Sequence, residues 1–344
     1  MKNLFKAYVV SILGFITLVG VIGVSMIACN LTLDSIYGTE LRFKLIDNGT
    51  AYSVSGEKRI KGDVVIPDFH EGLPVTSIDD EGFYDCASLT SITIPASVMS
   101  IGREAFRFCS NLTSIMVDEN NPYYTSEGWI LYNKAKTTLM QATARINGNL
   151  TIPDSVTEIC AYAISKCKNL TDITIPASVA SIGRGAFEGC VRLTSIMVDE
   201  NNPYYTIEGW ILYNKEKTIL IEALDGTIIR DNVTIPDSVT SIGSYAFYSC
   251  WSLTGITIPD SVTSIGSYAF YSCKKLTSIT IPASVTSIED RAFLFCDGLT
   301  SVTFADGSDI KDFSDYAFPV GNYSTGDVLK TAYLAGGAGT YRRA

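Results

Sequence analysis

A 23-residue sequence period constrains this chain more than any other feature. The dipeptide Ile-Pro recurs along the chain, and the same interval separates its prolines at 153 and 176, at 236 and 259, and at 259 and 282. Aligned on this dipeptide, the copies share the pattern L-x-x-I-x-I-P-x-x-V-x-x-I-x-x-x-A-F-x-x-C-x-x. A fixed period of this length indicates a repeat array in which each copy is one structural unit.

Within each copy, the first half predicts a strand and the second half a turn. The L-x-x-I-x-I segment alternates apolar and polar residues, and proline ends it where no further ladder donor is needed. The A-F-x-x-C segment is too short for an independent helix, so we expect one helical or 3-10 turn that buries Phe and Cys. Stacked copies can bury a continuous core that one copy cannot enclose. The predicted fold is therefore an α/β repeat solenoid, a curved array with parallel strands on one face and short helical or 3-10 turns on the other.

Two copies leave the 23-residue frame. The segment 114–139 returns almost unchanged at 195–220. Each segment begins as a regular strand and continues into Gly-Trp-Ile-Leu-Tyr-Asn-Lys, which predicts a hairpin with its turn near Asn133 or Asn214. Duplication of a module of roughly three coils explains this second periodicity.

The repeat resembles a known family. The Ile-Pro, Ala-Phe and Cys pattern, together with the Asp-Glu-Asn-Asn-Pro-Tyr-Tyr and Gly-Trp-Ile-Leu-Tyr-Asn-Lys variant, is similar to the bacterial leucine-rich repeats of BspA-like surface proteins. The resemblance covers residues 41–313 and implies a curved solenoid on a cell surface, in a family tied to adhesion and host-protein binding. It does not transfer a ligand. The predicted parts are a signal peptide at 1–28, a linker and capping β-hairpin at 29–60, the solenoid at 61–313 with irregular hairpin-bearing units near 114–150 and 195–232, and a C-terminal cap and flexible tail at 314–344.

The N-terminus predicts export. Lys2 and Lys6 precede an uncharged apolar run at 7–28, an order typical of a secretion leader. The tetrapeptide that ends in Cys29, Met-Ile-Ala-Cys, resembles a lipoprotein lipobox, which implies acylation of Cys29 and a membrane link through that lipid. An ordinary cleaved signal and a retained membrane anchor both stay open, since the run is about as long as the ~20 residues that span a bilayer. The predicted location is the cell surface or outer membrane.

Charge and motif content exclude several classes of function. The chain has 26 Lys and Arg against 36 Asp and Glu, a formal net charge of −10, whereas binding to a nucleic-acid backbone needs clustered cations. Its single histidine, His70, cannot supply a metal site or a catalytic triad, and the common nucleophile, zinc and phosphate-loop motifs are missing. We predict no enzyme, no cofactor, no metal and no nucleic-acid partner.

Seven of the nine cysteines occupy a single repeat position. A disulfide needs two Cβ atoms that point toward each other, whereas equivalent side chains in stacked coils point in parallel. A small, soft, apolar side chain suits an interior column without any bond. We expect buried free thiols at Cys86, Cys109, Cys167, Cys190, Cys250, Cys273 and Cys296.

The predicted strands place one outward residue between the two isoleucine positions of each copy. These residues form an uncharged ladder on the concave face, which could accept an extended polymer or a protein surface. Threonine is also simply favourable in an exposed strand, so a purely structural ladder is the alternative. The ladder consists of Thr93, Met116, Thr151, Thr174, Met197, Thr234, Thr257, Thr280 and Thr303.

Aromatic residues in the two irregular hairpins form a second candidate binding set, namely Trp129, Tyr132, Trp210 and Tyr213. Protruding aromatic side chains are typical binding anchors. The alternative is that they fold back over the core of their own hairpin. If they protrude, the duplication gives two equivalent contacts, which gain avidity when the target is itself repetitive.

Two functions follow from these features. The first is a cell-surface adhesion protein that binds an extracellular host, matrix or partner-cell protein, which the leader, the array and the missing catalytic set favour. The alternative is an exported glycan-binding module or glycan-active enzyme, which the hydroxyl ladder and the paired Trp and Tyr residues favour.

Overall fold

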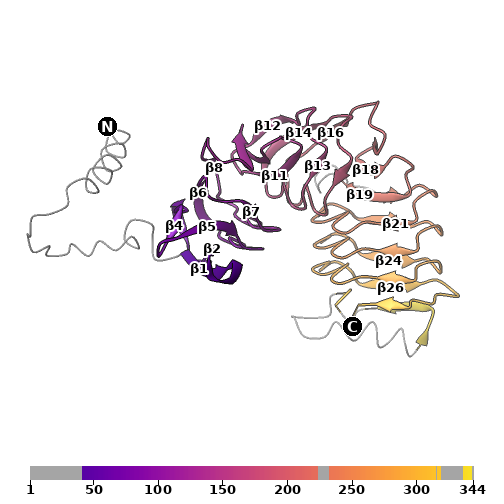
Figure 1. The fold of residues 1–344 in the computed structure, drawn as a ribbon. Coiled ribbons are helices and arrows are strands. Elements are labelled where there is room, and N and C mark those ends of the chain that lie inside the picture. The colour runs from indigo at the N-terminus through magenta and orange to yellow at the C-terminus, as the bar shows by residue number, and fades with distance from the viewer. Residues whose placement is uncertain (1–40, 224–231, 315, 319–335, 343–344) are drawn as a thin grey trace, which may run out of the picture. The chain divides into compact units, whose positions relative to one another are not determined.

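The computed structural model describes residues 41–223, 232–314, 316–318 and 336–342. All of these residues belong to one compact unit, Glu40–Ala344. Its strands and connecting turns form a β-solenoid (Figure 1).

Two predicted features lie outside the described residues: the leader at 1–28 and the lipidation site Cys29. In the part of the chain that is described, no helix is both long and apolar enough to cross a membrane.

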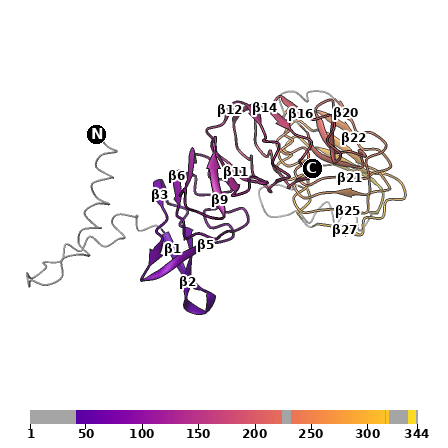
Figure 2. The ribbon, with the colours of Figure 1, turned by 45° about the horizontal axis from the view of Figure 1, so that its top comes forward.

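An antiparallel hairpin begins the array, as predicted. Its two strands pair from Leu41 with Gly56 to Ile46 with Ala51, and the second strand then pairs in parallel with the first coil (Figure 2). The hairpin therefore joins the sheet as a cap. The elements of this region are β1 (Leu41–Ile46), the 3-10 helix η1 (Asp47–Gly49), β2 (Ala51–Gly56), β4 (Phe69–His70), β5 (Leu73–Ile78) and β7 (Ser100–Ile101).

One strand from each coil forms a first parallel column. Thr93 lies beside Met116 and Thr280 beside Thr303, so partners are one sequence period apart and the period equals one coil. The column is divided into four sheets rather than one continuous ladder. These sheets comprise β3 (Lys61–Val65), β6 (Ser88–Ile94) and β8 (Ser114–Val117); β12 (Asn147–Thr151), β14 (Asn169–Ile175) and β16 (Ser195–Val198); β20 (Asn232–Thr234) and β22 (Gly255–Thr257); and β24 (Ser278–Ile281), β26 (Ser301–Phe304) and β28 (Gly339–Arg342).

A second column is built from the V-x-x-I part of each coil, where two residues pair with the next coil. The predicted hairpins join this column as antiparallel strands, and their turns follow Asn133 and Asn214 as expected. The sequence did not predict the strand that precedes each hairpin, at Tyr124–Glu127 and Tyr205–Glu208. The two sheets comprise β9 (Tyr124–Glu127), β10 (Ile130–Asn133), β11 (Thr138–Ala142), β13 (Glu158–Ile159) and β15 (Ser181–Ile182); and β17 (Tyr205–Glu208), β18 (Ile211–Asn214), β19 (Ile219–Ala223), β21 (Ser241–Ile242), β23 (Ser264–Ile265), β25 (Ser287–Ile288) and β27 (Asp312–Phe313).

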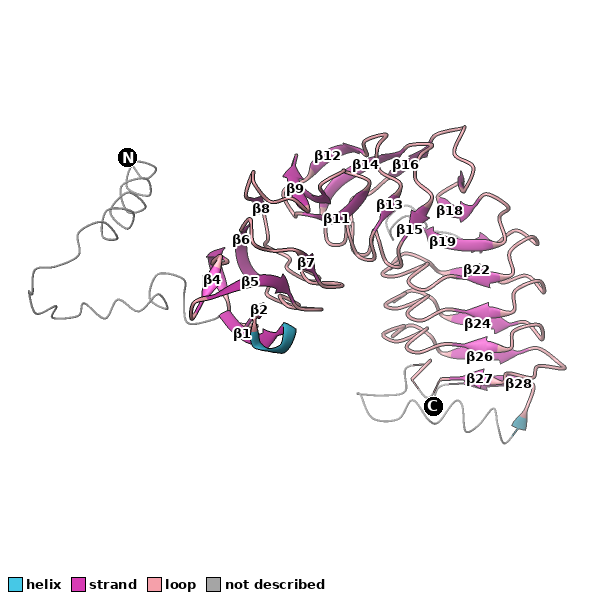
Figure 3. Cartoon of the chain, viewed as in Figure 1, coloured by secondary structure: helices cyan, strands magenta, loops and turns pink. Residues whose placement is uncertain are grey.

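The expected helical face is wrong, and with it the α/β class. None of the described A-F-x-x-C segments is helical; each is a turn (Figure 3). The cause is visible at Glu104 and Phe108, whose φ angles are +56° and +64°. Left-handed residues at this spacing cannot continue a right-handed helix. The turn instead hydrogen-bonds to the next coil, where the Phe83 N–H donates to the Ala105 carbonyl at 2.8 Å.

The core is a column of stacked repeats. Phe247, Phe270 and Phe293 are fully buried, with consecutive rings nearly parallel and centroids 5.0 and 4.9 Å apart. The seven repeat cysteines are buried, as predicted. Their thiols also have a role that the sequence did not indicate, because the Cys296 Sγ donates to the Phe270 carbonyl of the preceding coil at 2.9 Å. Burial raises the pKa of Cys167 to about 12.

The last described strand, β28, differs from the predicted flexible tail. It pairs antiparallel with β26, and the hydroxyl groups of Thr303 and Thr340 lie 2.8 Å apart. Residues 339–342 are therefore part of the sheet. They cover the edge that the last regular coil would otherwise expose.

Candidate binding surfaces

The predicted ladder is a row of exposed or half-exposed side chains in register. In the central sheet, Thr151, Thr174 and Met197 are neighbours across three strands. The row also includes Val65, which lies beside Thr93 and was missed because the first coil departs from the consensus. Six ladder hydroxyls have no hydrogen-bond partner among the described residues, those of Thr93, Thr151, Thr174, Thr234, Thr257 and Thr280.

The two methionines mark ends of sheets rather than interruptions within one ladder. Met116 lies on β8 and Met197 on β16, each the last strand of its sheet. Their side chains are 47% and 49% exposed. Each of these two sheets therefore presents small side chains followed by an unbranched apolar side chain, a type that adapts readily to irregular surfaces.

The ladder does not lie on the face toward which neighbouring coils converge, so the predicted concave placement is wrong. Convergence occurs at the turns, where Arg107 Nη2 donates to the hydroxyl of Tyr245, far along the sequence, at 3.2 Å. The same guanidinium lies 3.5 Å from the ring centroid of Tyr162. Ladder residues instead pair only with the neighbouring strands.

The hairpin aromatics divide into exposed and buried pairs. Trp129 and Trp210 are 45% and 50% exposed, at the short turns that precede β10 and β18. Tyr132 and Tyr213 are buried in the core at 3% and 2% exposure, so they cannot contact a partner and their prediction as binding residues is wrong. The split follows from position, because Tyr132 and Tyr213 lie within β10 and β18, whose first three residues are all buried, whereas the tryptophans lie in the turns before these strands.

A buried asparagine anchors each hairpin to the preceding coil. The Asn121 side chain donates to the carbonyls of Pro95 and Val98 and accepts from the N–H groups of Tyr123 and Tyr124 at 2.8 to 2.9 Å. Asn202 repeats these contacts in the second hairpin unit. The Asp-Glu-Asn-Asn motif is thus a structural anchor, and the described residues contain no cluster suited to a metal ion.

A charged brace crosses the first irregular unit at the turns. The Glu188 side chain is fully buried, with carboxylate oxygens 3.2 Å from Lys166 Nζ and 3.6 Å from Arg107 Nη2. Arg107 also pairs with Glu104 at 2.9 Å, and Arg184 pairs with the same carboxylate at 2.9 Å. Buried charges of this kind are tolerated only when paired.

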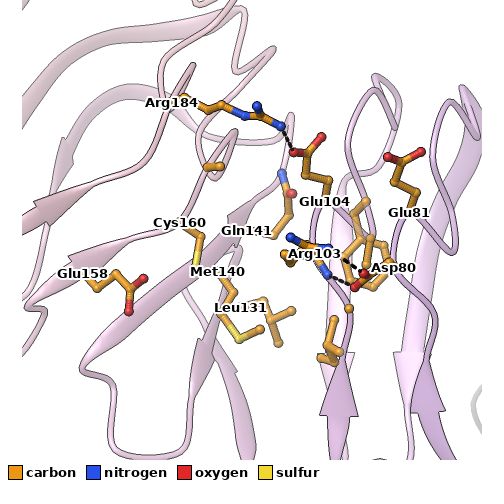
Figure 4. Close-up of a pocket in the computed structure, with 15 residues that line it drawn as sticks. Asp80, Glu81, Arg103, Glu104, Leu131, Met140, Gln141, Glu158, Cys160 and Arg184 are labelled. Carbon is orange, nitrogen blue, oxygen red and sulfur yellow. Dashed lines mark hydrogen bonds and ion pairs between the residues drawn. The ribbon is translucent and has the colours of Figure 1, made fainter. Parts of the chain in front are cut away.

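A pocket of about 620 Å³ lies beside this brace, between the turn at 102–106 and the strand and turn at 158–161 (Figure 4). Its apolar lining includes Leu131 and Met140 from the hairpin. Its volume is within the range of ligand-binding pockets.

The polar lining of the pocket combines paired and unpaired charges. Arg103 pairs with Asp80 at 3.2 Å, and the Glu104 carboxylate is held by Arg184. The carboxylates of Glu81 and Glu158 have no cationic partner among the described residues. The pocket therefore has unpaired negative charge.

The thiol of Cys160 also lines the pocket. Burial, with a smaller contribution from the neighbouring Glu158 carboxylate, raises its pKa to about 11. The thiol is therefore protonated at neutral pH and unsuited to act as a nucleophile. The sequence indicated no role for this cysteine or for the acidic residues around it.

Comparison with known proteins identifies the repeat. The model of the BspA-type leucine-rich repeat region matches residues 76–202, 142–222 and 204–324. The chain belongs to the BspA-type leucine-rich repeat family. The resemblance noted from the Ile-Pro and Ala-Phe pattern is confirmed. No curated protein sequence matches the chain.

Solved structures with similar folds are bacterial leucine-rich repeat proteins. A leucine-rich repeat protein from Eubacterium ventriosum is 22% identical, with 75% of this chain and 93% of that chain covered and a TM-score of 0.42. A leucine-rich cell surface protein from Faecalibacterium prausnitzii is 21% identical, with coverage of 82% and 97% and a TM-score of 0.38. The pneumococcal vaccine antigen PcpA is 16% identical, with coverage of 86% and 94% and a TM-score of 0.38. The family assignment rests on the repeat match, not on these likenesses.

Proposed function

We propose that this protein is an exported surface protein that binds an extracellular protein through its ladder. The observation that carries the proposal is the row of six exposed or half-exposed threonines whose hydroxyls no described residue satisfies. Such groups can hydrogen-bond to a partner without first breaking an internal bond. The row has no charged member, which favours close contact over long-range electrostatic attraction.

The methionines extend this surface. Met116 and Met197 add exposed apolar area at the ends of two sheets. Methionine is enriched at protein interfaces, and an apolar contact beside hydrogen-bonding groups fits a protein surface better than a small polar ligand. The predicted leader at 1–28 and the BspA-type repeat support a location outside the cell. Acylation of Cys29 would hold the solenoid at the membrane.

Direct binding measurements test the ladder. The purified protein is screened against immobilised extracellular matrix and host-surface proteins and against glycans. Replacement of Thr151, Thr174 and Met197 by alanine together should weaken protein binding at least tenfold with an unchanged melting temperature. The matched control replaces Thr263 and Thr286, which are exposed threonines whose hydroxyls donate to backbone carbonyls of the preceding coil. Equal loss of protein binding in both variants, or no loss in the variant at Thr151, Thr174 and Met197, contradicts the proposal.

Glycan binding is the second candidate because two indole rings are exposed at equivalent hairpin turns. Arg145 lies 4.3 Å from the ring of Trp129, which holds one of these side chains in place. A glycan array tests this function. The second candidate would replace the first under two conditions. Glycan binding must be lost when Trp129→Ala and Trp210→Ala are combined, and the screen must find no protein ligand.

A further inference from the structure

The turns of neighbouring coils are joined by their own set of backbone hydrogen bonds, a turn ladder that is separate from the threonine ladder. In the first coil, the N–H groups of Glu81, Phe83 and Asp85 donate to carbonyls of the next turn at 2.8, 2.8 and 3.0 Å. Every second residue donates in one direction, so each turn presents N–H groups to the following coil and carbonyl groups to the preceding one. The same ladder joins Tyr245, Phe247 and Ser249 to Ser267, Ala269 and Tyr271.

The first hairpin unit interrupts this ladder because it has no A-F-x-x-C turn. The N–H groups of Glu104, Phe106 and Phe108 have no acceptor in the described part of the chain. On the far side of the gap, the carbonyls of Ala161 and Ser165 likewise have no donor there. Buried backbone groups are rarely left unpaired.

The pocket occupies the open part of this gap. Its lining includes Glu104 and Phe106 on the donor side and Ala161 on the acceptor side. The other end of the gap, at Phe108, lies beside Arg107, whose guanidinium stacks on Tyr162. The space available is therefore next to Glu104 and Phe106, where Figure 4 shows the pocket between two separated parts of the ribbon.

We propose that this gap is a peptide-binding site, in which an extended segment of another protein takes the place of the missing turn. The segment accepts hydrogen bonds from the N–H groups of Glu104 and Phe106 and donates one to the Ala161 carbonyl. Addition of a strand to an open backbone edge is a recurrent mode of peptide recognition, in which main-chain bonds give affinity and side-chain pockets give specificity.

The charges of the pocket specify a basic segment. Glu81 and Glu158 are exposed carboxylates with no cationic partner among the described residues, whereas both arginines of the lining are already paired with Asp80 and Glu104. A lysine or arginine of the bound segment therefore finds an unpaired carboxylate. Its aliphatic stem can lie along Met140, since long cationic side chains bury their stems against apolar surface.

The second hairpin unit supplies an internal control. It has the same backbone gap, since the N–H groups of Gly185 and Phe187 and the carbonyl of Ser244 lack partners among the described residues. At the positions of Glu81 and Glu158, however, it has Tyr162 and Ser241. A basic peptide should therefore prefer the first gap. Neither gap includes a residue of the threonine ladder described above. The peptide site can therefore fail its test while the proposed function of the threonine ladder stands, and the ladder can fail while the peptide site stands.

Two labelled hexapeptides test the proposal, acetylated and amidated Ser-Lys-Ala-Phe-Lys-Ser and its Glu counterpart Ser-Glu-Ala-Phe-Glu-Ser. Fluorescence polarisation with the full-length chain should show binding of the lysine peptide and at least tenfold weaker binding of the glutamate peptide. The double variant E81Q/E158Q should lose at least tenfold in affinity for the lysine peptide. The control E119Q/E200Q makes the same change in net charge at exposed sites outside the pocket and should leave affinity unchanged.

Amide hydrogen exchange identifies the backbone groups involved. With the lysine peptide present, exchange should slow at Glu104 and Phe106 and stay unchanged at Gly185 and Phe187. Absence of lysine-peptide binding overturns the proposal. Equal affinity of E81Q/E158Q and the parent chain, or protection that does not include Glu104 and Phe106, overturns it as well.

Discussion

The regular stack that follows the second hairpin and the stretch that contains the first hairpin are built from the same repeat but are held together differently. In the regular stack, Phe247, Phe270 and Phe293 stack ring on ring, and the turns of adjacent coils bond directly. Across the first hairpin, the brace of Glu188, Arg107 and their partners spans a gap instead. The difference shows that buried ion pairs lie where the repeat is interrupted. In uninterrupted coils, the backbone groups of adjacent turns form hydrogen bonds with one another instead.

The largest effect is expected in the regular stack. Phe270→Ala should lower the free energy of unfolding by about 3–5 kcal/mol, because it removes a fully buried ring between two stacked neighbours. Urea unfolding measures the change. Phe69→Ala is the control, because Phe69 is 63% exposed and should change stability by less than about 0.5 kcal/mol. Similar losses in both variants would contradict the stacked core.

A somewhat smaller effect is expected in the brace. Glu188→Ala should cost about 3 kcal/mol, because it removes the buried counter-charge of Lys166 and one of the two carboxylates that pair with Arg107. Thermal unfolding of the variant measures the loss, and Glu200→Ala, at an exposed carboxylate, is the control. An unchanged melting temperature for Glu188→Ala would mean that the gap needs no charged support.

The hairpin anchors should have an intermediate effect. Asn121→Ala should cost about 1–3 kcal/mol, because it leaves backbone groups of two segments without their hydrogen bonds. The neighbouring Asn120 is exposed, so Asn120→Ala is the control in the same unfolding assay. Asn202→Ala tests the second hairpin, and equal costs at the two sites would confirm that the duplicated units are held alike.

The smallest effect is a difference in reactivity between thiols. Native alkylation followed by mass spectrometry should label Cys160 before Cys167, because Cys160 is only partly buried. Only the thiolate reacts, and the pKa of Cys160 is raised to about 11. Its labelling should therefore be slow at pH 8 and rise with pH until about 11. Fast labelling of Cys160 at pH 8 would contradict the raised pKa of its thiol.

Periodicity predicted the parts of the fold in which one coil resembles the next. It located the ladder strands and the buried cysteines. The residue pattern of the irregular segments located the turns after Asn133 and Asn214, and the family resemblance implied the capping hairpin. It failed for the A-F-x-x-C turns, because left-handed residues at Glu104 and Phe108 have no signal in residue type. Tyr132 was misplaced because β10 is covered on both faces, with Tyr132 in one core cluster and its neighbour Leu131 in another, so the strand has no exposed side that the sequence pattern could mark.

The pocket could not be predicted for a related reason. Its residues come from four separate coils and from a hairpin, and only the stacked structure brings Glu81 and Glu158 to one cavity. The sequence did contain one signal. A unit that leaves the 23-residue frame has no turn of its own, and its neighbours on either side therefore keep unpaired backbone groups.

The two ends of the array determine whether copies of this protein can polymerise. A stack of parallel strands is a template for its own growth, since each open edge can accept another chain. Here β28 runs antiparallel to the last regular strand, and at the start β1 is an antiparallel strand that carries the exposed side chains of Arg42 and Lys44. Both terminal strands are poor matches for a further parallel coil. Each end of the described array therefore presents an edge that does not continue the parallel pattern of the coils, which works against end-to-end addition of a second copy in the same register.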